Sequence, residues 1–169
     1  IKEIYIHAFT DGRDTDPKSG LNFMTDLYHH TLKTKTQIAT VTGRYFAMDR
    51  DNRWERVALA YHAMVHGVGD ASQDILASLA KNYADGVTDE FIKPIIMTNA
   101  DGTAVGNIES GDVVICFNFR TDRGREITQA LTQKDFPEQG MKPLDLYYLT
   151  MTEYDKEFKG VHVIFNDSN

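Results

Sequence analysis

Short apolar segments alternate with longer amphipathic ones along most of the chain, and this alternation restricts the possible fold more than any other feature. The strand-like segments are rich in β-branched and aromatic residues; they span residues 4–9, 37–41, 92–97, 113–119, 144–149 and 161–165. The helix-like segments carry apolar residues near helical spacing; they span residues 19–34, 53–66, 70–83 and 122–131. The alternation predicts an α/β fold: a three-layer sandwich in which helices flank a mainly parallel sheet.

Particular residues refine this expectation. Ser19 is a candidate N-cap of the first helix, and Gly86 lies just past the end of the third. Pro94 interrupts the segment 92–97 and favours an edge position for that strand. The residues of the third helix that we expect to face inward are Ile75, Leu76, Leu79 and Ala80.

Length and composition fit one globular domain over residues 1–169. The chain has 169 residues, 41% of them hydrophobic, which allows a substantial core. No run of 18 apolar residues occurs, so we expect no membrane-spanning helix, and the first residues lack the features of a signal peptide. The single cysteine, Cys116, lies in an apolar run and is expected to be a buried core residue. A chain without an internal disulfide fits a reducing, cytoplasmic location.

The arginines are clustered although the chain as a whole is acidic. The net charge of −7 argues against a nucleic-acid partner, because binding a phosphate backbone requires a basic face. Arginine's planar guanidinium suits bidentate binding of phosphate or carboxylate, whereas lysine acts as a point charge. The lysines are scattered, but the arginines form three groups: Arg13; Arg44, Arg50, Arg53 and Arg56; and Arg120, Arg123 and Arg125. This grouping indicates a local anion pocket.

Five of these arginines lie in the segments that follow predicted strands; they are Arg13, Arg44, Arg50, Arg120 and Arg123. Ligands of open α/β sheets bind beyond the carboxyl ends of the strands, so we expect these five at one edge. Arg123 also falls in the first turn of a predicted helix, where free N–H groups favour anions. The ordinary alternative is a solvated surface position. We expect that position for the remaining three arginines, with Glu55 and Glu126 nearby to form ion pairs.

Acidic residues accompany the arginines. Asp49 and Asp122 are expected to hold neighbouring arginines in place. Asp14, beside Arg13 in a loop, has two possible roles that the sequence leaves open. It either holds an arginine or accepts a substrate hydroxyl proton as a general base.

Four segments together resemble the cofactor-independent phosphoglycerate mutase family. Residues 7–15 read HAFTDGRDT, residues 42–51 read TGRYFAMDRD with RWER at 53–56, residues 118–125 read NFRTDRGR, and residues 149–155 read LTMTEYD. They occur in the family's order from one end of the chain to the other. Gly124 departs from the pattern, in which alanine is usual.

The resemblance implies a role in interconverting 3-phosphoglycerate and 2-phosphoglycerate in glycolysis. Such enzymes have a phosphatase-like domain, related to alkaline phosphatase, with a serine nucleophile and two manganese ions, and an inserted domain that grips the substrate. This chain resembles most of the inserted domain, about a third of a whole enzyme. The resemblance implies that the substrate-binding residues are Arg13, Asp14, Arg44, Arg50, Arg120 and Arg123, with Asp14 as the catalytic candidate.

The nucleophile and metal ligands of such an enzyme have no counterpart that we recognise in this sequence. The pairs His29–His30 and His62/His66 lack neighbouring carboxylates, so we expect no metal site in this chain. We therefore expect a fragment that needs the phosphatase-like domain of the same protein as its partner and is inactive alone. The alternative is a stand-alone anion-binding module. A nucleotide-binding domain is disfavoured because no glycine-rich phosphate loop occurs.

Overall fold

The four strands nearest the N-terminus form one mixed sheet in the computed structural model, which describes residues 1–166. Its order is β1-β2-β4-β3, from β1 (Ile4–Thr10), β2 (Thr36–Gly43), β4 (Ile95–Met97) and β3 (Asp70–Ser72). The β1–β2 and β3–β4 pairs are parallel, whereas β2 and β4 are antiparallel. A second, parallel sheet has the order β5-β6-β7, from β5 (Val113–Cys116), β6 (Tyr147–Thr150) and β7 (Val161–Val163).

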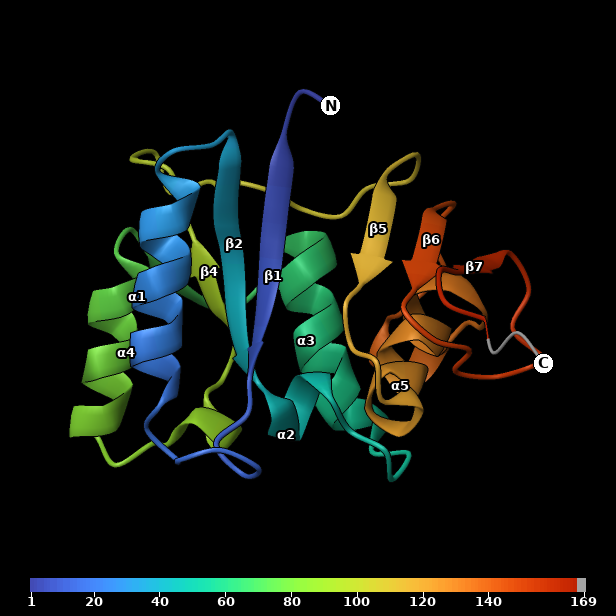
Figure 1. Cartoon of the computed structure of the whole chain (residues 1–169), viewed down its shortest axis with the longest axis horizontal. Helices are drawn as coiled ribbons and strands as arrows, with labels where there is room; N and C mark the ends of the chain where they lie inside the picture. The colour runs from blue at the N-terminus through green and yellow to red at the C-terminus, as the bar shows by residue number, and fades with distance from the viewer. Residues whose placement is uncertain (167–169) are drawn as a thin grey trace.

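Helices pack on the sheets and between them. Helix α1 (Gly20–Thr31) and helix α4 (Ile75–Ala84) cover one face of the four-stranded sheet, and α3 (Trp54–His66) covers the other (Figure 1). Helix α3 also packs against α5 (Thr121–Thr132), which accompanies the second sheet. Short helical segments complete the connections: α2 (Arg44–Ala47), η1 (Asp89–Phe91) and η2 (Pro137–Gln139). The expected α/β class with mainly parallel pairing is confirmed, and the strands are divided between two sheets.

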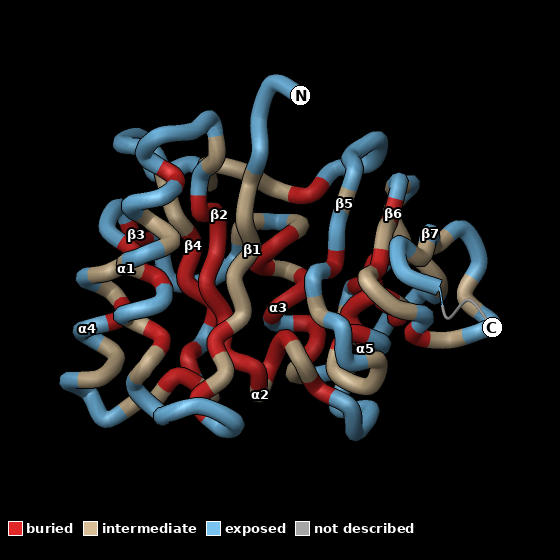
Figure 2. The backbone as a smooth tube through the Cα atoms, viewed as in Figure 1, coloured by how far each residue is buried: buried red, intermediate tan, exposed pale blue. Residues whose placement is uncertain are grey.

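Two apolar clusters lie on opposite faces of the four-stranded sheet. One joins β2 and β4 to α1 and α4 through residues that include Met24, Val41, Leu79 and Ile95. The other joins α3, α5 and β6 and includes Val57, Tyr61, Ile127 and Tyr148. Strands β2 and β4 are accordingly largely buried, as are the inner faces of helices α3 and α5 (Figure 2). Cys116 belongs to the second cluster, as predicted, and Tyr154 donates a hydrogen bond to its Sγ at 3.3 Å.

The predicted helix 70–83 is wrong at its start. Residues Asp70–Ser72 form β3, which pairs with β4, and the helix begins only at Ile75. The cause is Asp74, whose side chain accepts a hydrogen bond from the backbone N–H of Ala77 and thereby fixes the N-terminus of α4. Of the residues expected to face inward, Ile75 and Leu79 are buried but Ala80 is exposed.

The edge position predicted for the Pro94 strand is also wrong. Strand β4 lies between β2 and β3, but it begins after Pro94, so the missing N–H removes no bond from the sheet. The Pro94 carbonyl accepts a hydrogen bond from Asp70 N–H at 2.9 Å. Strand 113–119 is shorter than expected and ends at Cys116, and the side chains of Phe117 and Phe119 are exposed.

Ser19 occupies the N-cap position of α1 but does not cap the helix with its side chain. Its hydroxyl donates to the Asp16 carbonyl at 2.7 Å. The backbone N–H of Gly20 instead donates at 2.7 Å to the side chain of Asp89, which lies 69 residues further along the chain. The fully buried Asp89 carboxylate also accepts from the Tyr83 hydroxyl, so it fastens η1 to the start of α1 and to α4. This long-range bond replaces the local cap that the sequence predicts.

Candidate functional site

The loop after β1 is shaped by its own aspartate. Asp11 Oδ1 accepts from the backbone N–H groups of Arg13 and Asp14, both at 3.1 Å, which folds the loop into a compact turn. Gly12 adopts a φ of 69°, and a Cβ there would lie 2.7 Å from Cβ of Asp89. A left-handed backbone packed this closely against η1 requires glycine. The turn presents Arg13 and Asp14 to solvent at the end of the sheet.

Arg44 links this loop to the end of β2. Its guanidinium Nη1 lies 2.5 Å from Asp11 Oδ1 and 3.0 Å from Asp14 Oδ2, and only 5% of its side chain is exposed. Burial by itself would lower the pKa of Arg44, but the hydrogen bonds to the two aspartates outweigh it and raise that pKa. The Arg44 bond is the main cause that lowers the pKa of Asp14, so this carboxylate is ionised at neutral pH.

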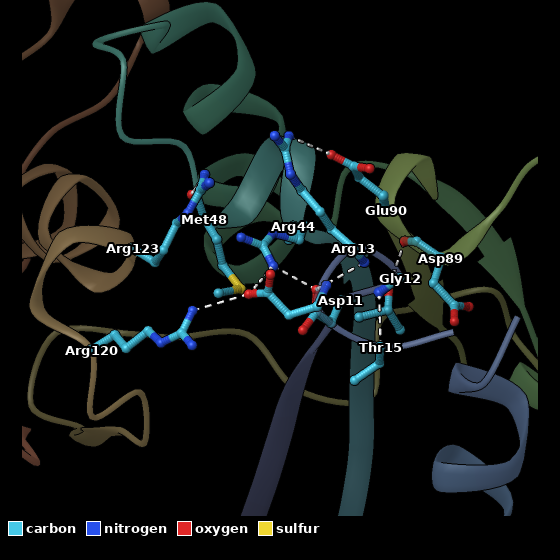
Figure 3. A network of polar contacts seen from close by, with 12 residues as sticks. Asp11, Gly12, Arg13, Thr15, Arg44, Met48, Asp89, Glu90, Arg120 and Arg123 are labelled. Atoms are coloured by element: carbon cyan, nitrogen blue, oxygen red, sulfur yellow. Dashed lines mark hydrogen bonds and ion pairs between the residues drawn. The ribbon is translucent and has the colours of Figure 1, made fainter. Parts of the chain in front are cut away.

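Arg120 reaches the same carboxylate from the other sheet. Its Nη1 donates to Asp14 Oδ2 at 3.0 Å across 106 residues of sequence. Figure 3 shows Arg44 and Arg120 approaching Asp11 from separate elements, whereas Arg123 points to Met48. Strands β1 and β5 both run toward this end of the molecule (Figure 1), so Arg13, Arg44 and Arg120 lie at one edge, as the strand-end argument predicts.

An open polar cavity of about 250 Å³ adjoins this network. It is lined by Arg13, Arg44, Tyr45, Asp49, Arg50, Asp51, Arg56, Glu90, Phe91 and Arg123. Four of the five arginines predicted for the pocket therefore line the cavity. The fifth, Arg120, lies outside the lining, as does Asp14, through which it is linked to Arg44. Burial, followed by repulsion from Arg44 and Arg50, lowers the pKa of Arg123.

Carboxylates hold several of these arginines in place. Asp122 pairs with Arg50 at 2.8 Å, which confirms the holding role predicted for Asp122. Asp49 Oδ1 lies 3.7 Å from Arg56, and Glu90 lies 3.5 Å from Arg13. The most exposed of these ion pairs contribute little to stability in water.

Arg56 is the arginine that the sequence reading misplaced. We expected it on a helix surface, but it lines the cavity, and its guanidinium lies 3.8 Å from the ring centroid of Tyr45. The signal that could have found it is its place in the first turn of α3, which follows the Arg50 loop directly. Glu90 and Phe91 were missed because no basic residue marks η1 in the sequence.

The other two arginines that we expected on the surface lie outside the cavity lining. Arg53 pairs with Glu55 at 2.6 Å, as expected, and Arg125 donates to the Tyr154 carbonyl at 3.0 Å. The expectation that Glu126 forms an ordinary ion pair is wrong. It is buried and accepts a hydrogen bond from the backbone N–H of Asn52.

The described residues do not suit the manganese ions that the family resemblance implies. Within residues 1–166, no three His, Cys, Asp or Glu side chains are grouped so that they could hold a metal ion. The cavity is lined by five guanidinium groups, which repel a cation. The described helices also include none long and apolar enough to cross a membrane.

Comparison with known proteins decides the family. Residues 1–156 match the family model described as the BPG-independent PGAM N-terminus. The chain belongs to the BPG-independent phosphoglycerate mutase family. It is 53% identical to the 2,3-bisphosphoglycerate-independent phosphoglycerate mutase of Flavobacterium psychrophilum, over all of this chain and 34% of that protein. It is 52% identical to the enzyme of the same name from Bacteroides thetaiotaomicron, over all of this chain and 33% of that protein.

A solved structure supports the same assignment. The chain superimposes on a crystal structure of Leishmania mexicana phosphoglycerate mutase, determined at low cobalt concentration, with a TM-score of 0.84 and 32% identity. The match covers 92% of this chain and 30% of that one. The chain thus spans about a third of the length of the phosphoglycerate mutases that it resembles.

Gly124, the departure from the family pattern, has a local structural reason. A Cβ at this position would lie 2.5 Å from the ring of Tyr154, which packs against α5. Alanine here requires the Tyr154 ring to move, so the glycine and the position of this ring belong together.

Proposed function

We propose that this chain is the substrate-gripping part of a BPG-independent phosphoglycerate mutase, which interconverts 3-phosphoglycerate and 2-phosphoglycerate. The observation that carries the proposal is the meeting of arginines from three distant segments at one open polar cavity in a member of this family. On this proposal the intact enzyme acts in glycolysis in the cytoplasm.

The cavity has the chemistry that phosphoglycerate requires. The substrate carries a phosphate and a carboxylate, and both accept paired hydrogen bonds from a guanidinium. A single arginine holds only one of these groups. Several around one cavity can keep the glycerate bound while its phosphate moves between hydroxyls. We assign this clamp to Arg13, Arg44, Arg50, Arg120 and Arg123.

We assign to Asp14 the role of accepting a hydrogen bond from a glycerate hydroxyl. It is bound by Arg44 and Arg120, and the resulting low pKa makes it a good hydrogen-bond acceptor but a weak base. When the two arginines turn to the substrate anion, the Asp14 carboxylate loses these partners and becomes more basic. Asp14 then receives the hydroxyl proton as general base.

The phosphoryl-transfer chemistry itself is assigned to another part of the intact protein. The manganese ions and the serine nucleophile belong to a phosphatase-like domain, which is the partner of this chain. On this proposal the 169-residue chain alone turns over no 3-phosphoglycerate.

Exchanging one arginine for lysine in the intact enzyme tests the clamp. Arg120→Lys retains the charge but loses bidentate geometry, and we expect kcat/KM to fall about ten- to a hundredfold in both directions. Arg125 donates to the Tyr154 carbonyl and not to Asp14, so Arg125→Lys is the matched control and should change kcat/KM less than about twofold. Equal and negligible effects of the two substitutions would show that the clamp is assigned to the wrong residues. Intact protein with no mutase activity but with bound phosphoglycerate would favour an anion-binding module.

A further inference from the structure

The loop that carries Arg50, residues 48–53, depends on buried hydrogen bonds for its shape. Asp49 is only 4% exposed, and its Oδ2 accepts from the N–H groups of Asp51 at 3.1 Å and Arg53 at 2.9 Å. Asn52 has a φ of 58°; no other non-glycine residue in the described part of the chain has a positive φ. This left-handed conformation is uncommon outside glycine, although asparagine adopts it more often than most residues.

Helix α5 contacts this loop at three points. Asp122 pairs with Arg50 at 2.8 Å, Arg123 Nη1 donates to the Met48 carbonyl at 3.0 Å, and Glu126 Oε2 accepts from Asn52 N–H at 3.1 Å. The first two contacts use guanidinium groups that line the cavity, and a bound anion competes for both. Glu126 does not line the cavity. Its bond to the loop therefore remains when the arginines turn to a ligand.

Glu126 is a buried carboxyl group with one unsatisfied oxygen. The residue is 5% exposed, and Oε1 has no donor within hydrogen-bonding distance. A buried ionised carboxylate without partners is costly, and a proton removes this cost. Burial, and then the neighbouring carboxylate of Asp49, raise the pKa of Glu126 to about 7. A proton shared between Glu126 and Asp49 removes the repulsion between the two carboxylates.

The other charged groups around this carboxyl pair come from three elements. They are Asp51, Arg50 and Arg53 on the loop, Arg56 on α3, which lies 3.7 Å from Asp49, and Asp122 and Arg123 on α5. Asp51 adds to the repulsion on an ionised Glu126, whereas Arg56 pairs with Asp49.

We propose that Glu126 is a positioning residue, which fastens the loop 48–53 to helix α5 and so fixes Arg50 and Arg123 relative to each other at the anion cavity. The effect of Glu126 on substrate binding rests on the proposed function, whereas its contact with the loop 48–53 does not. Glu126→Gln retains an acceptor for Asn52 N–H and adds a donor toward Asp49, so it mimics the protonated side chain. Glu126→Ala removes both.

Hydrogen exchange at the Asn52 amide, in the 169-residue chain at pH 6, tests the contact without any ligand. We expect a protected amide in the unmodified chain and in Glu126→Gln, and at least about tenfold faster exchange in Glu126→Ala. Far-UV circular dichroism confirms that each variant is folded. The exposed Glu138→Gln serves as the matched control and should leave the amide unchanged. Equal protection of Asn52 in Glu126→Ala and in the unmodified chain overturns the proposal.

Mutase kinetics of the intact protein test the consequence for substrate. We expect Glu126→Ala to lower kcat/KM about tenfold at pH 6, and Glu126→Gln to match the unmodified enzyme there. Between pH 6 and pH 8.5 Glu126 ionises, so kcat/KM of the unmodified enzyme should fall about three- to tenfold relative to Glu126→Gln. Titration of the substrate phosphate is common to both enzymes and cancels in this ratio.

The two experiments separate this inference from the proposed function. A ratio that stays constant from pH 6 to pH 8.5, with Glu126→Ala as active as the unmodified enzyme, overturns the positioning role. An intact protein without any mutase activity overturns the proposed function, and the exchange of the Asn52 amide then still decides whether Glu126 holds the loop.

Discussion

Replacing Arg44 by alanine is expected to destabilise the fold as well as the site. The Arg44 side chain is 5% exposed and donates to Asp11 at 2.5 Å and to Asp14 at 3.0 Å, so it connects the end of β2 to the loop after β1. Its loss removes the guanidinium that pairs with Asp11 and leaves Asp14 with Arg120 alone.

The size of this effect follows from the number of bonds and the exposure of the acceptors. A hydrogen bond to a charged group contributes about 1.5–3 kcal/mol, and two such bonds set an upper range of about 3–6 kcal/mol. The Asp11 and Asp14 side chains are 34% and 49% exposed and regain water in the variant. We therefore expect Arg44→Ala to lower the free energy of unfolding by about 2–3 kcal/mol.

Urea unfolding of the 169-residue chain, followed by circular dichroism, measures this difference. Arg120→Ala is the control, because it removes a bond to the same Asp14 from a side chain that is 63% exposed, and it should shift the midpoint very little. The Arg44 bonds lower the pKa of Asp11 and Asp14, so their stabilisation is present above about pH 4 and is lost as the pH falls below the depressed folded-state values. The urea midpoints of the unmodified chain and of Arg44→Ala should accordingly become more alike near pH 3. Equal midpoints for Arg44→Ala and Arg120→Ala at pH 7 would refute the reasoning.

Two further predictions concern His7 and Asp14. Burial lowers the pKa of His7 to about 4, below its ordinary 6.5, so the stability that comes from keeping His7 neutral is complete above pH 6.5 and is lost as the pH falls toward 4. His7→Gln, which retains a partner for Thr40, should reduce the drop in thermal midpoint between pH 7 and pH 5; an unchanged drop would exclude His7 as its cause. In the intact enzyme, Asp14→Asn should lower kcat about a hundredfold while KM changes less than about threefold, if Asp14 receives the hydroxyl proton. A larger effect on KM than on kcat would instead assign Asp14 to binding alone.

Sequence reasoning predicted the arginine positions well because a simple geometrical rule places them. Arg13, Arg44 and Arg120 each follow a strand, and parallel strands deliver the residues after them to one end of the molecule. The rule holds here even though β5 lies in a separate sheet, since Arg120 still reaches Asp14. Helix α3 was predicted almost to the residue because its buried positions, among them Val57 and Tyr61, repeat at helical spacing.

The features that sequence reasoning missed all depend on contacts between distant segments. Nothing near Glu126 in the sequence indicates that its carboxyl group is buried against Asn52, 74 residues earlier. In the same way, the cap of α1 comes from Asp89 and not from the adjacent Ser19. The short strand β3 is stabilised by pairing with β4, which a local pattern of three residues does not reveal. Arg56 shows the same limit, because its place over Tyr45 results from the packing of α3 on α2.

A crystal structure of the intact protein with bound 3-phosphoglycerate tests the central claim most directly. We predict that guanidinium nitrogens lie within hydrogen-bonding distance, about 2.7–3.2 Å, of the phosphate or carboxylate oxygens, and that Asp14 accepts a glycerate hydroxyl. A second complex, with 2-phosphoglycerate, completes the test. Taken together, the ligands of the two complexes should contact all five arginines of the clamp: Arg13, Arg44, Arg50, Arg120 and Arg123. A phosphoglycerate bound away from this cavity, or held there without these arginines, would contradict the account.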